Sequence, residues 1–285
     1  MIVHLNGKLV PRDQALVSVF DRGFLFGDGL YEGLRAFDGR VVAMDLHVER
    51  LRQGLAECRI AWDAAEMAGL TDELLRANNL RDAFIYWQVT RGTPGPGQAV
   101  RGRVPAGPMM PTVMGFCYPT SGLAQNAAPA VKRAVISQDT RWLRGRVKSI
   151  SLLGGVLAAI EAHEHGADDA ILVRDGLVAE GTSSNVFVAL EDGFGGTRIA
   201  TPSLQSAPIL AGVTRDLLLA ADPAIEERSI SVRELVEARE IMLAGTLSMV
   251  TSVVEIGGRP VGTGRPGPCA AGLLELLLRL IHGGR

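Results

Sequence analysis

The chain has 285 residues, of which 47% are apolar and 21% are charged, and its net charge is −2. This composition is typical of a globular protein long enough for two domains, and it excludes a disordered, collagen-like or coiled-coil chain. The charges are spread along the chain and form no basic region for a nucleic acid. No apolar stretch reaches the ~20 residues of a membrane span, and the first residues lack the pattern of a signal peptide. We therefore expect a cytoplasmic protein that binds neither nucleic acid nor a membrane.

The first part of the chain predicts β-hairpins. The dipeptides Asn6-Gly7 and Asp38-Gly39 are typical of two-residue turns, so the flanking residues 2–5, 8–11, 30–37 and 41–44 are predicted to be strands. We expect Asp45 to cap a helix whose apolar side chains are Leu46, Leu51, Leu55 and Cys58. A second helix is predicted over 64–78, and strands over 83–89 and 112–118. Residues 92–111 are rich in glycine and proline, which predicts a long loop.

The small and polar residues 120–129 are predicted to connect an N-terminal domain, residues 1–119, with a larger C-terminal domain, residues 130–285. Strands and helices mix in the second half as well. The predicted strands are 131–137, 170–173, 186–190, 225–230, 240–244 and 248–256, and the predicted helices are 152–165, one beginning near Gly212, 232–238 and 270–281. The helix over 152–165 is expected to bury Leu152, Val156, Ala159, Ile160 and His163. The fold class predicted from this order is mixed α/β (α+β) in two domains.

Few residues are available for chemistry that needs a primary amine, because Lys8, Lys132 and Lys148 are the only lysines among 29 basic residues. Two segments, Gly212-Val213-Thr214 and Gly245-Thr246, offer backbone N–H groups and a hydroxyl to an anion, although each is also typical of a helix cap or a turn. The three cysteines are far apart and predict neither a disulfide nor a zinc site, and no metal site is expected.

Two charged residues have structural as well as functional interpretations. Arg50 lies on a predicted helix, where it is able to pair with Asp45 or Glu49 across one turn. Glu180 stands between apolar residues and small hydroxyl residues, where it is either a turn cap or a buried counter-charge. The residues alone leave these alternatives open.

Five blocks of residues occur in a fixed order: 21–32 (DRGFLFGDGLYE), 88–93 (QVTRGT), 141–149 (RWLRGRVKS), 180–185 (EGTSSN) and 212–216 (GVTRD). With these blocks the chain resembles the class IV, or fold-type IV, pyridoxal-phosphate-dependent aminotransferases along its whole length. Within this family it is most similar to the D-amino-acid aminotransferases. The resemblance implies a homodimer of two-domain subunits, with pyridoxal 5'-phosphate in the cleft between the domains.

The resemblance also implies a role for individual residues. Lys148 would hold the cofactor as a Schiff base and carry the proton between the substrate carbon and the cofactor, while Glu180 would pair with the ring nitrogen. The remaining cofactor-binding residues would be Arg50, Ser183, Val213, Thr214 and Thr246. Tyr31 and Tyr86 would line the substrate side. Strand alternation places Arg35 on the same face as Tyr31, which makes Arg35 a candidate for binding the substrate carboxylate.

One departure from the family concerns this carboxylate. D-amino-acid aminotransferases of the usual type bind it with an Arg-x-His pair, and the matching positions here are Pro96 and Gln98. Arg35, Arg91, Arg101 or Arg103 would be the replacement, since arginine binds carboxylates with two hydrogen bonds.

Several activities are compatible with these residues. The main expectation is a ping-pong transfer of the amino group from a D-amino acid, such as D-alanine, to a 2-oxo acid. The alternatives are an (R)-selective amine transaminase, a branched-chain L-amino-acid aminotransferase, which the stretch 31–35 also resembles, and an aminodeoxychorismate lyase. A protein that binds the cofactor without catalysis is a further alternative.

Overall fold

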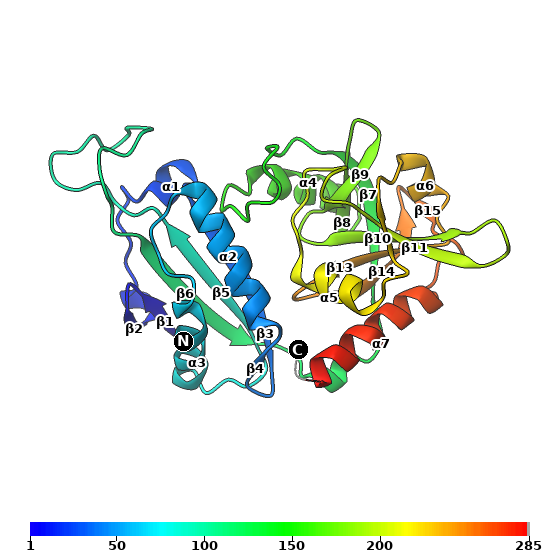
Figure 1. Cartoon of the computed structure of the whole chain (residues 1–285), viewed down its shortest axis with the longest axis horizontal. Coiled ribbons are helices and arrows are strands. Elements are labelled where there is room, and N and C mark those ends of the chain that lie inside the picture. The colour runs from blue at the N-terminus through cyan, green and yellow to red at the C-terminus, as the bar shows by residue number, and fades with distance from the viewer. Residues whose placement is uncertain (284–285) are drawn as a thin grey trace. The chain divides into compact units, whose positions relative to one another are not determined.

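The computed structural model describes residues 1–283, and the chain forms two compact units (Figure 1). The first unit contains Met1–Gly122 and Val147–Leu152, and the second contains Leu123–Arg146 and Leu153–Arg285. The chain thus enters the first unit twice. The segment Val147–Leu152 belongs to the first unit, whereas the predicted domain boundary at residues 120–129 places it in the C-terminal domain.

The first unit is built on a six-stranded antiparallel sheet in the order β2-β1-β6-β5-β3-β4. Its strands are β1 (Ile2–Leu5), β2 (Lys8–Pro11), β3 (Gly29–Phe37), β4 (Arg40–Val41), β5 (Ala83–Thr90) and β6 (Thr112–Pro119). Its helices are η1 (Arg12–Gln14), α1 (Arg22–Phe26), α2 (Met44–Cys58) and α3 (Glu66–Ala77). Both predicted hairpins are confirmed, and the long loop follows β5.

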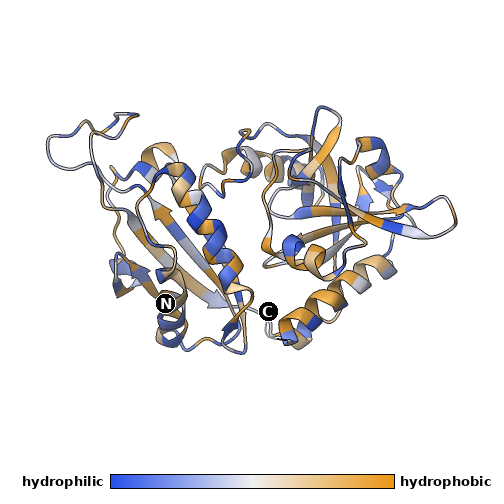
Figure 2. Ribbon diagram, in the orientation of Figure 1, coloured by the Kyte–Doolittle hydropathy of each residue, from blue (hydrophilic) through white to orange (hydrophobic). Residues whose placement is uncertain are grey.

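Two local predictions around α2 are wrong. The strand predicted over 41–44 ends at Val41, and the helix begins at Met44 after Ala43, whose φ of 47° is left-handed. Asp45 therefore lies inside the first turn, where its charge favours the N-terminal end of the helix without capping it. Figure 2 shows hydrophilic and hydrophobic positions alternating along α2, as expected for a helix with one buried face.

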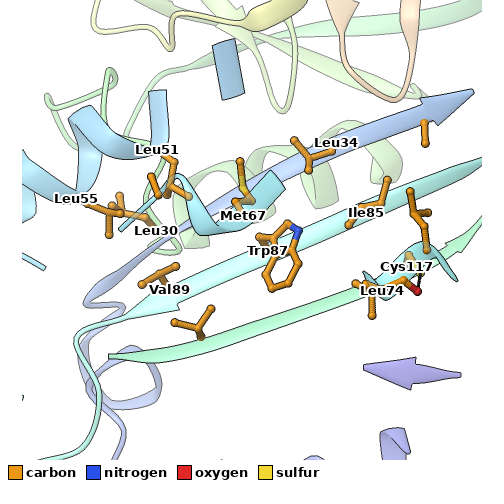
Figure 3. Close-up of a cluster of buried hydrophobic side chains, with 14 of the residues drawn as sticks. Leu30, Leu34, Leu51, Leu55, Met67, Leu74, Ile85, Trp87, Val89 and Cys117 are labelled. Carbon is orange, nitrogen blue, oxygen red and sulfur yellow. Dashed lines mark hydrogen bonds between the residues drawn. The ribbon is translucent and has the colours of Figure 1, made fainter. Parts of the chain in front are cut away.

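Strand alternation divides the side chains of the first sheet between its two faces. Leu30, Leu34, Ile85 and Trp87 point to the face that α2 and α3 cover, and all four are at most 1% exposed (Figure 3). Trp87 donates its indole N–H to Thr71 Oγ1 at 2.9 Å, so the polar atom inside this core is satisfied. On the opposite face, Phe84, Tyr86 and Gln88 of β5 are only half-buried, which leaves them accessible to a ligand.

The second unit contains a nine-stranded mixed sheet whose main order is β12-β11-β10-β13-β14-β7-β8-β9. Its strands are β7 (Ala130–Gln138), β8 (Asp169–Arg174), β9 (Leu177–Gly181), β10 (Asn185–Glu191), β11 (Thr197–Pro202), β12 (Glu226–Arg228), β13 (Glu240–Gly245), β14 (Met249–Ile256) and β15 (Arg259–Pro260). Its helices are η2 (Leu123–Asn126), α4 (Leu153–Glu164), α5 (Val213–Ala221), α6 (Val232–Val236) and α7 (Pro268–His282). The mixed α/β fold is confirmed.

Helix α4 corrects the prediction for residues 152–165. It buries Ala158 and Ala162, whereas the five residues expected to be buried, Leu152, Val156, Ala159, Ile160 and His163, are all exposed. The physical reason is size, because the small alanines let the helix approach an alanine-rich part of the core around Ala167 and Ala170. The large apolar side chains are left on the outside.

Within residues 1–283, no helix is both long and apolar enough to cross a membrane. The same residues contain no cluster of histidine, cysteine or carboxylate side chains able to hold a metal ion.

Candidate active site

Lys148 lies against the accessible face of the first sheet. The segment around it pairs with the start of β3, because Tyr31 N donates to Lys148 O at 3.0 Å and Ile150 N donates to Gly29 O at 3.1 Å. Val147 is buried in the core of the first unit, so alternation turns Lys148 to the other side. There its Nζ lies 4.2 Å from the centroid of the Tyr31 ring.

The other two lysines have ordinary surroundings. Lys132 pairs with Asp169 at 2.8 Å, and Lys8 is exposed on β2. Within the described part of the chain, Lys148 is therefore the one half-buried lysine that has no carboxylate partner. An amine in this position is able to act as a nucleophile once it loses its proton.

Aromatic rings continue from Tyr31 across the same face of the sheet. The rings of Tyr31 and Tyr86 stack with centroids 5.6 Å apart, and those of Tyr86 and Phe116 stack at 5.1 Å. The Tyr86 hydroxyl donates to Gln88 Oε1 at 2.9 Å, and burial raises the pKa of Tyr86 to about 12. The predicted substrate residues Tyr31 and Tyr86 are thus brought together, with Lys148 over the Tyr31 ring, and their rings offer a flat apolar platform.

Arg50 points to the helix-covered side of the sheet, where it binds a buried carboxylate. Its Nε donates to Glu32 Oε1 at 2.8 Å and one terminal nitrogen donates to Glu32 Oε2 at 2.7 Å, while His47 Nδ1 lies 2.7 Å from the same Oε2. Burial alone would raise the pKa of Glu32, but the charge and hydrogen bond of Arg50 and the hydrogen bond of His47 hold that pKa at about 2. Burial lowers the pKa of His47 more than Glu32 raises it. Near pH 7 the cluster therefore contains an anionic Glu32, a cationic Arg50 and a neutral His47.

Glu180 is at the centre of a second charged network, in the second unit. Its carboxylate accepts from Arg141 at 2.6 Å, from Asn185 Nδ2 at 3.2 Å and from Leu210 N at 3.1 Å. Arg141 also pairs with Asp139, and although burial would lower the pKa of Arg141, its hydrogen bonds and the two carboxylates raise it. Of the two interpretations of Glu180, the buried counter-charge is the one that agrees with this geometry, since its side chain is 8% exposed.

The predicted anion-binding residues gather near this network. Helix α5 starts at Val213 after Gly212 without a side-chain cap, and both Val213 and Thr214 are buried. A Cβ at Gly212 would come within 2.0 Å of Asn185 Oδ1, so this approach requires glycine. The first backbone N–H groups of α5 have no partner inside the helix and are suited to an anion.

The turn that contains Thr246 belongs to the same neighbourhood. A Cβ on Gly245 would lie 3.5 Å from Ser183 O and 3.6 Å from Ser184 Cβ, so this turn approaches residues 183–184. Asn185 in turn pairs with Ala244 in the neighbouring strand β13. Ser183 itself is exposed. The four predicted cofactor residues Ser183, Val213, Thr214 and Thr246 therefore all belong to the end of the second sheet around Asn185.

The arginines expected to replace the missing carboxylate pair fall into two groups. Arg35 is buried, donates to the carbonyl and hydroxyl oxygens of Ser121 and lies over the Phe37 ring at 4.6 Å. Arg91 binds Asp28 at 2.7 Å and the backbone carbonyls of residues 58 and 59 at 2.8 Å. Both arginines thus stabilise the unit, whereas Arg101 and Arg103 are exposed on the loop over residues 92–111.

This loop is attached to the first unit by Arg22. Its guanidinium donates to the carbonyl oxygens of Gly102 and Arg103 and pairs with Asp28 at 2.8 Å. Phe26 lies between the guanidinium of Arg22, at 4.7 Å, and that of Arg101, at 5.5 Å. The exposed arginines of the loop are therefore carried by a fixed segment.

Sequence reasoning missed several residues that the structure places at these sites. Glu32 and His47 hold Arg50, and Arg141 and Asn185 hold Glu180. One signal was available, because alternation along β3 puts Glu32 on the face opposite Tyr31, where the amphipathic helix has to pack. The contacts of Arg141 had no such signal, since they join residues 39 positions apart.

The chain is similar to known aminotransferases along most of its length. The family model described as amino-transferase class IV matches residues 29–256. D-alanine aminotransferase of Bacillus licheniformis is 36% identical over 274 residues, which cover 94% of this chain and 93% of that protein. A putative branched-chain-amino-acid aminotransferase of Methanocaldococcus jannaschii is also 36% identical, over 285 residues that cover 96% of this chain and 94% of that protein.

Solved structures give the same result. The branched-chain aminotransferase of Thermoproteus uzoniensis, crystallised with norvaline, superposes with a TM-score of 0.85 at 26% identity over 100% of this chain and 96% of that one. The branched-chain amino acid aminotransferase of Escherichia coli has a TM-score of 0.87 at 25% identity over 99% and 95% of the two chains. A third branched-chain amino acid aminotransferase, from a T.th. strain and in complex with N-(5'-phosphopyridoxyl)-L-glutamate, has a TM-score of 0.84 at 26% identity over 100% and 95% of the two chains.

Proposed function

Because this chain belongs to the class IV aminotransferase family, we propose that it transfers the amino group of a D-amino acid, with D-alanine as the reference donor, to a 2-oxo acid with the help of pyridoxal 5'-phosphate. Curated D-alanine aminotransferases at 36% and 34% identity over nearly the whole chain support the choice of donor. The single observation that carries the proposal is Lys148, a half-buried amine over the Tyr31 ring without a carboxylate partner in the described chain.

The residues present suit this cofactor on three counts. A free lysine amine matches its aldehyde, the uncapped start of α5 beside Gly212 matches its phosphate, and the buried Glu180 carboxylate matches its ring nitrogen. Ser183, Thr214 and Thr246 would add hydroxyl or backbone donors to the phosphate. Arg50 would supply the cation, as the family resemblance implies. When bound, the cofactor supplies an electron sink for the electrons released at the substrate Cα.

The roles of the protein residues follow from the chemistry of transamination. Lys148 Nζ would take the proton from the substrate Cα and return it in the second half-reaction. Glu180 would hold a proton on the ring nitrogen, and Arg141 would keep Glu180 anionic by charge and hydrogen bonding. Tyr31 and Tyr86 would exclude water from one side of the reacting carbon.

The spectrum and the half-reaction of the purified protein test the proposal. After loading with pyridoxal phosphate, borohydride reduction and peptide mass mapping should locate the adduct on Lys148. In a separate sample of the loaded protein that has not been reduced, D-alanine should convert the cofactor to its pyridoxamine form and release pyruvate, and a second 2-oxo acid should reverse the change. An adduct on Lys8 or Lys132, or no response to any amine, would contradict the proposal.

A second candidate is the branched-chain L-amino-acid aminotransferase, which one relative at 36% identity and several similar structures favour. Running the half-reaction with L-leucine and (R)-1-phenylethylamine beside D-alanine ranks the donors. A lyase of the aminodeoxychorismate type would instead release pyruvate from its own substrate without an amino acceptor.

We also propose that the working form is a homodimer. Helix α4 exposes Leu153, Leu157 and Ile160, and the segment before α1 exposes Leu16 and Phe20, at fractions between 48% and 81%. Large exposed apolar side chains of this kind are typical of surfaces that a partner covers. Sedimentation of the wild type should give twice the monomer mass, and Leu157→Glu should shift it toward the monomer.

A further inference from the structure

We propose that Gln88 is a binding residue for the substrate carboxylate, whose oxygens accept hydrogen bonds from the side-chain amide of Gln88. The inference deepens the proposed function and rests on it. The positions that match the Arg-x-His pair are Pro96 and Gln98, so the carboxylate needs a hydrogen-bond donor elsewhere in this chain. The expected ligand class is a small monocarboxylate that carries an amine at its α-carbon.

The register of the sheet places Gln88 beside the reacting amine. Gln88 on β5 is directly opposite Tyr31 on β3, and the Cβ atoms of opposite residues are about 5 Å apart. Both side chains lie on the accessible face of the sheet, and Lys148 Nζ is 4.2 Å from the Tyr31 ring. In an α-amino acid the nitrogen and the carboxylate share one carbon. A substrate that reacts at Lys148 therefore has its carboxylate close to this row of residues.

The hydrogen bond to Tyr86 fixes the orientation of the Gln88 amide. The Tyr86 hydroxyl donates to Gln88 Oε1 at 2.9 Å, and because burial raises the pKa of Tyr86 to about 12, this donor stays protonated across the working pH range. With its oxygen occupied, the amide turns Nε2 and its two N–H groups the other way. Within residues 1–283, Gln88 Nε2 donates no hydrogen bond to another residue. The side chain is only half-buried, and Nε2 is not a buried atom that lacks a partner, so this nitrogen is open to solvent.

The charged groups nearby do not compete for this role. Arg35 is bound to Ser121 and Phe37, Arg91 is bound to Asp28, and Glu32 lies on the opposite face of the sheet. An uncharged amide binds a carboxylate less strongly than an arginine pair does. A carboxylate-binding residue of this kind predicts modest discrimination between amino acids and simple amines.

Two substitutions at Gln88 separate the hydrogen bond from the shape of the side chain. Gln88→Met keeps the length and removes the donors, and Gln88→Glu keeps an oxygen for Tyr86 but places a negative charge where the N–H groups were. Gln14→Glu, at an exposed position of the same unit, adds the same charge as a matched control. All four proteins are compared as holoenzymes. Borohydride mapping of Lys148 in the wild type tests the proposed function separately.

The first measurement is the dissociation constant of propionate, a carboxylate without an amine, from the change in cofactor absorbance. We expect binding to weaken about tenfold in Gln88→Met and about a hundredfold in Gln88→Glu, with no change in Gln14→Glu. KM for D-alanine should rise by similar factors while kcat changes little. Equal propionate affinity in Gln88→Met and the wild type, no propionate binding by the wild type, or a loss confined to kcat would overturn the inference while leaving a Lys148 adduct intact.

Discussion

Replacing Glu32 by glutamine removes the charge from the carboxylate that holds Arg50. Glu32 is 0% exposed, and it accepts two hydrogen bonds from Arg50 and lies 2.7 Å from His47 Nδ1. A neutral amide leaves the mostly buried Arg50 without its counter-charge. Breaking a buried pair in this way costs about 3–5 kcal/mol of unfolding free energy.

The pKa of Glu32 gives an independent measure of the same interaction. It falls from the ordinary 4.5 to about 2, which corresponds to about 3 kcal/mol. Because this pKa is lower in the folded state, the stabilisation is fully present above pH 4.5 and is lost as the pH falls toward 2. Glu32→Gln should therefore be less stable by about 3 kcal/mol at pH 7 and should show a weaker loss of stability on acidification.

Urea unfolding followed by tryptophan fluorescence measures this free energy, and Glu49→Gln is the matched control. Glu49 lies on the same side of the sheet in α2, and hydrogen bonds from Arg52 and Gln53 lower its pKa to about 2 as well, but its side chain is 46% exposed. Solvent screens such a surface pair, so the control should unfold like the wild type. If Glu32→Gln were no less stable than Glu49→Gln, the reasoning from burial would be refuted.

Three further outcomes are expected. Thr71→Val keeps the shape of the side chain but leaves the buried Trp87 N–H without its acceptor. The unfolding free energy should therefore fall by about 1–3 kcal/mol, and an unchanged urea midpoint would contradict this. Glu180→Ala should slow the first half-reaction with D-alanine at least a hundredfold, which is the usual size of losses in proton transfer. Stopped-flow absorbance measures this rate, and a rate equal to that of the wild type would exclude the role of Glu180 at the ring nitrogen. If the loop contributes to carboxylate binding, alanine at both Arg101 and Arg103 should raise KM for amino acids and leave KM for (R)-1-phenylethylamine unchanged. An equal rise of KM for both kinds of donor would exclude that contribution.

Local chemistry explains which features could be predicted without the structure. Asn6-Gly7 and Asp38-Gly39 gave the right hairpins because left-handed turn residues are a property of a few consecutive positions. The start of α5 after Gly212 was also predictable locally, because Gly212 directly precedes an apolar helical segment. Lys148 was singled out by its scarcity and by its place in the fixed order of family blocks, and Glu180 by its flanking residues.

The partners of these residues were decided by tertiary packing. Glu49 is adjacent to Arg50 in the sequence, yet the structure pairs Glu49 with Arg52 and gives Arg50 the carboxylate of Glu32, 18 positions away on a strand. Arg35 lies on the predicted face but is bound to Ser121, 86 positions away. Side-chain charge is a property of one residue, whereas its desolvation and its counter-charge depend on which distant segments the fold brings together.

Helix α4 also separates what the local sequence predicts from what tertiary packing decides. Its sequence predicted a helix because apolar residues recur in it at helical spacing, but the helix is apolar on more than one side. Periodicity favoured the large side chains for the core, and the structure buried the alanines. The choice between the faces depended on how closely the helix approaches its sheet, which is set by the small residues of strands and loops elsewhere in the chain.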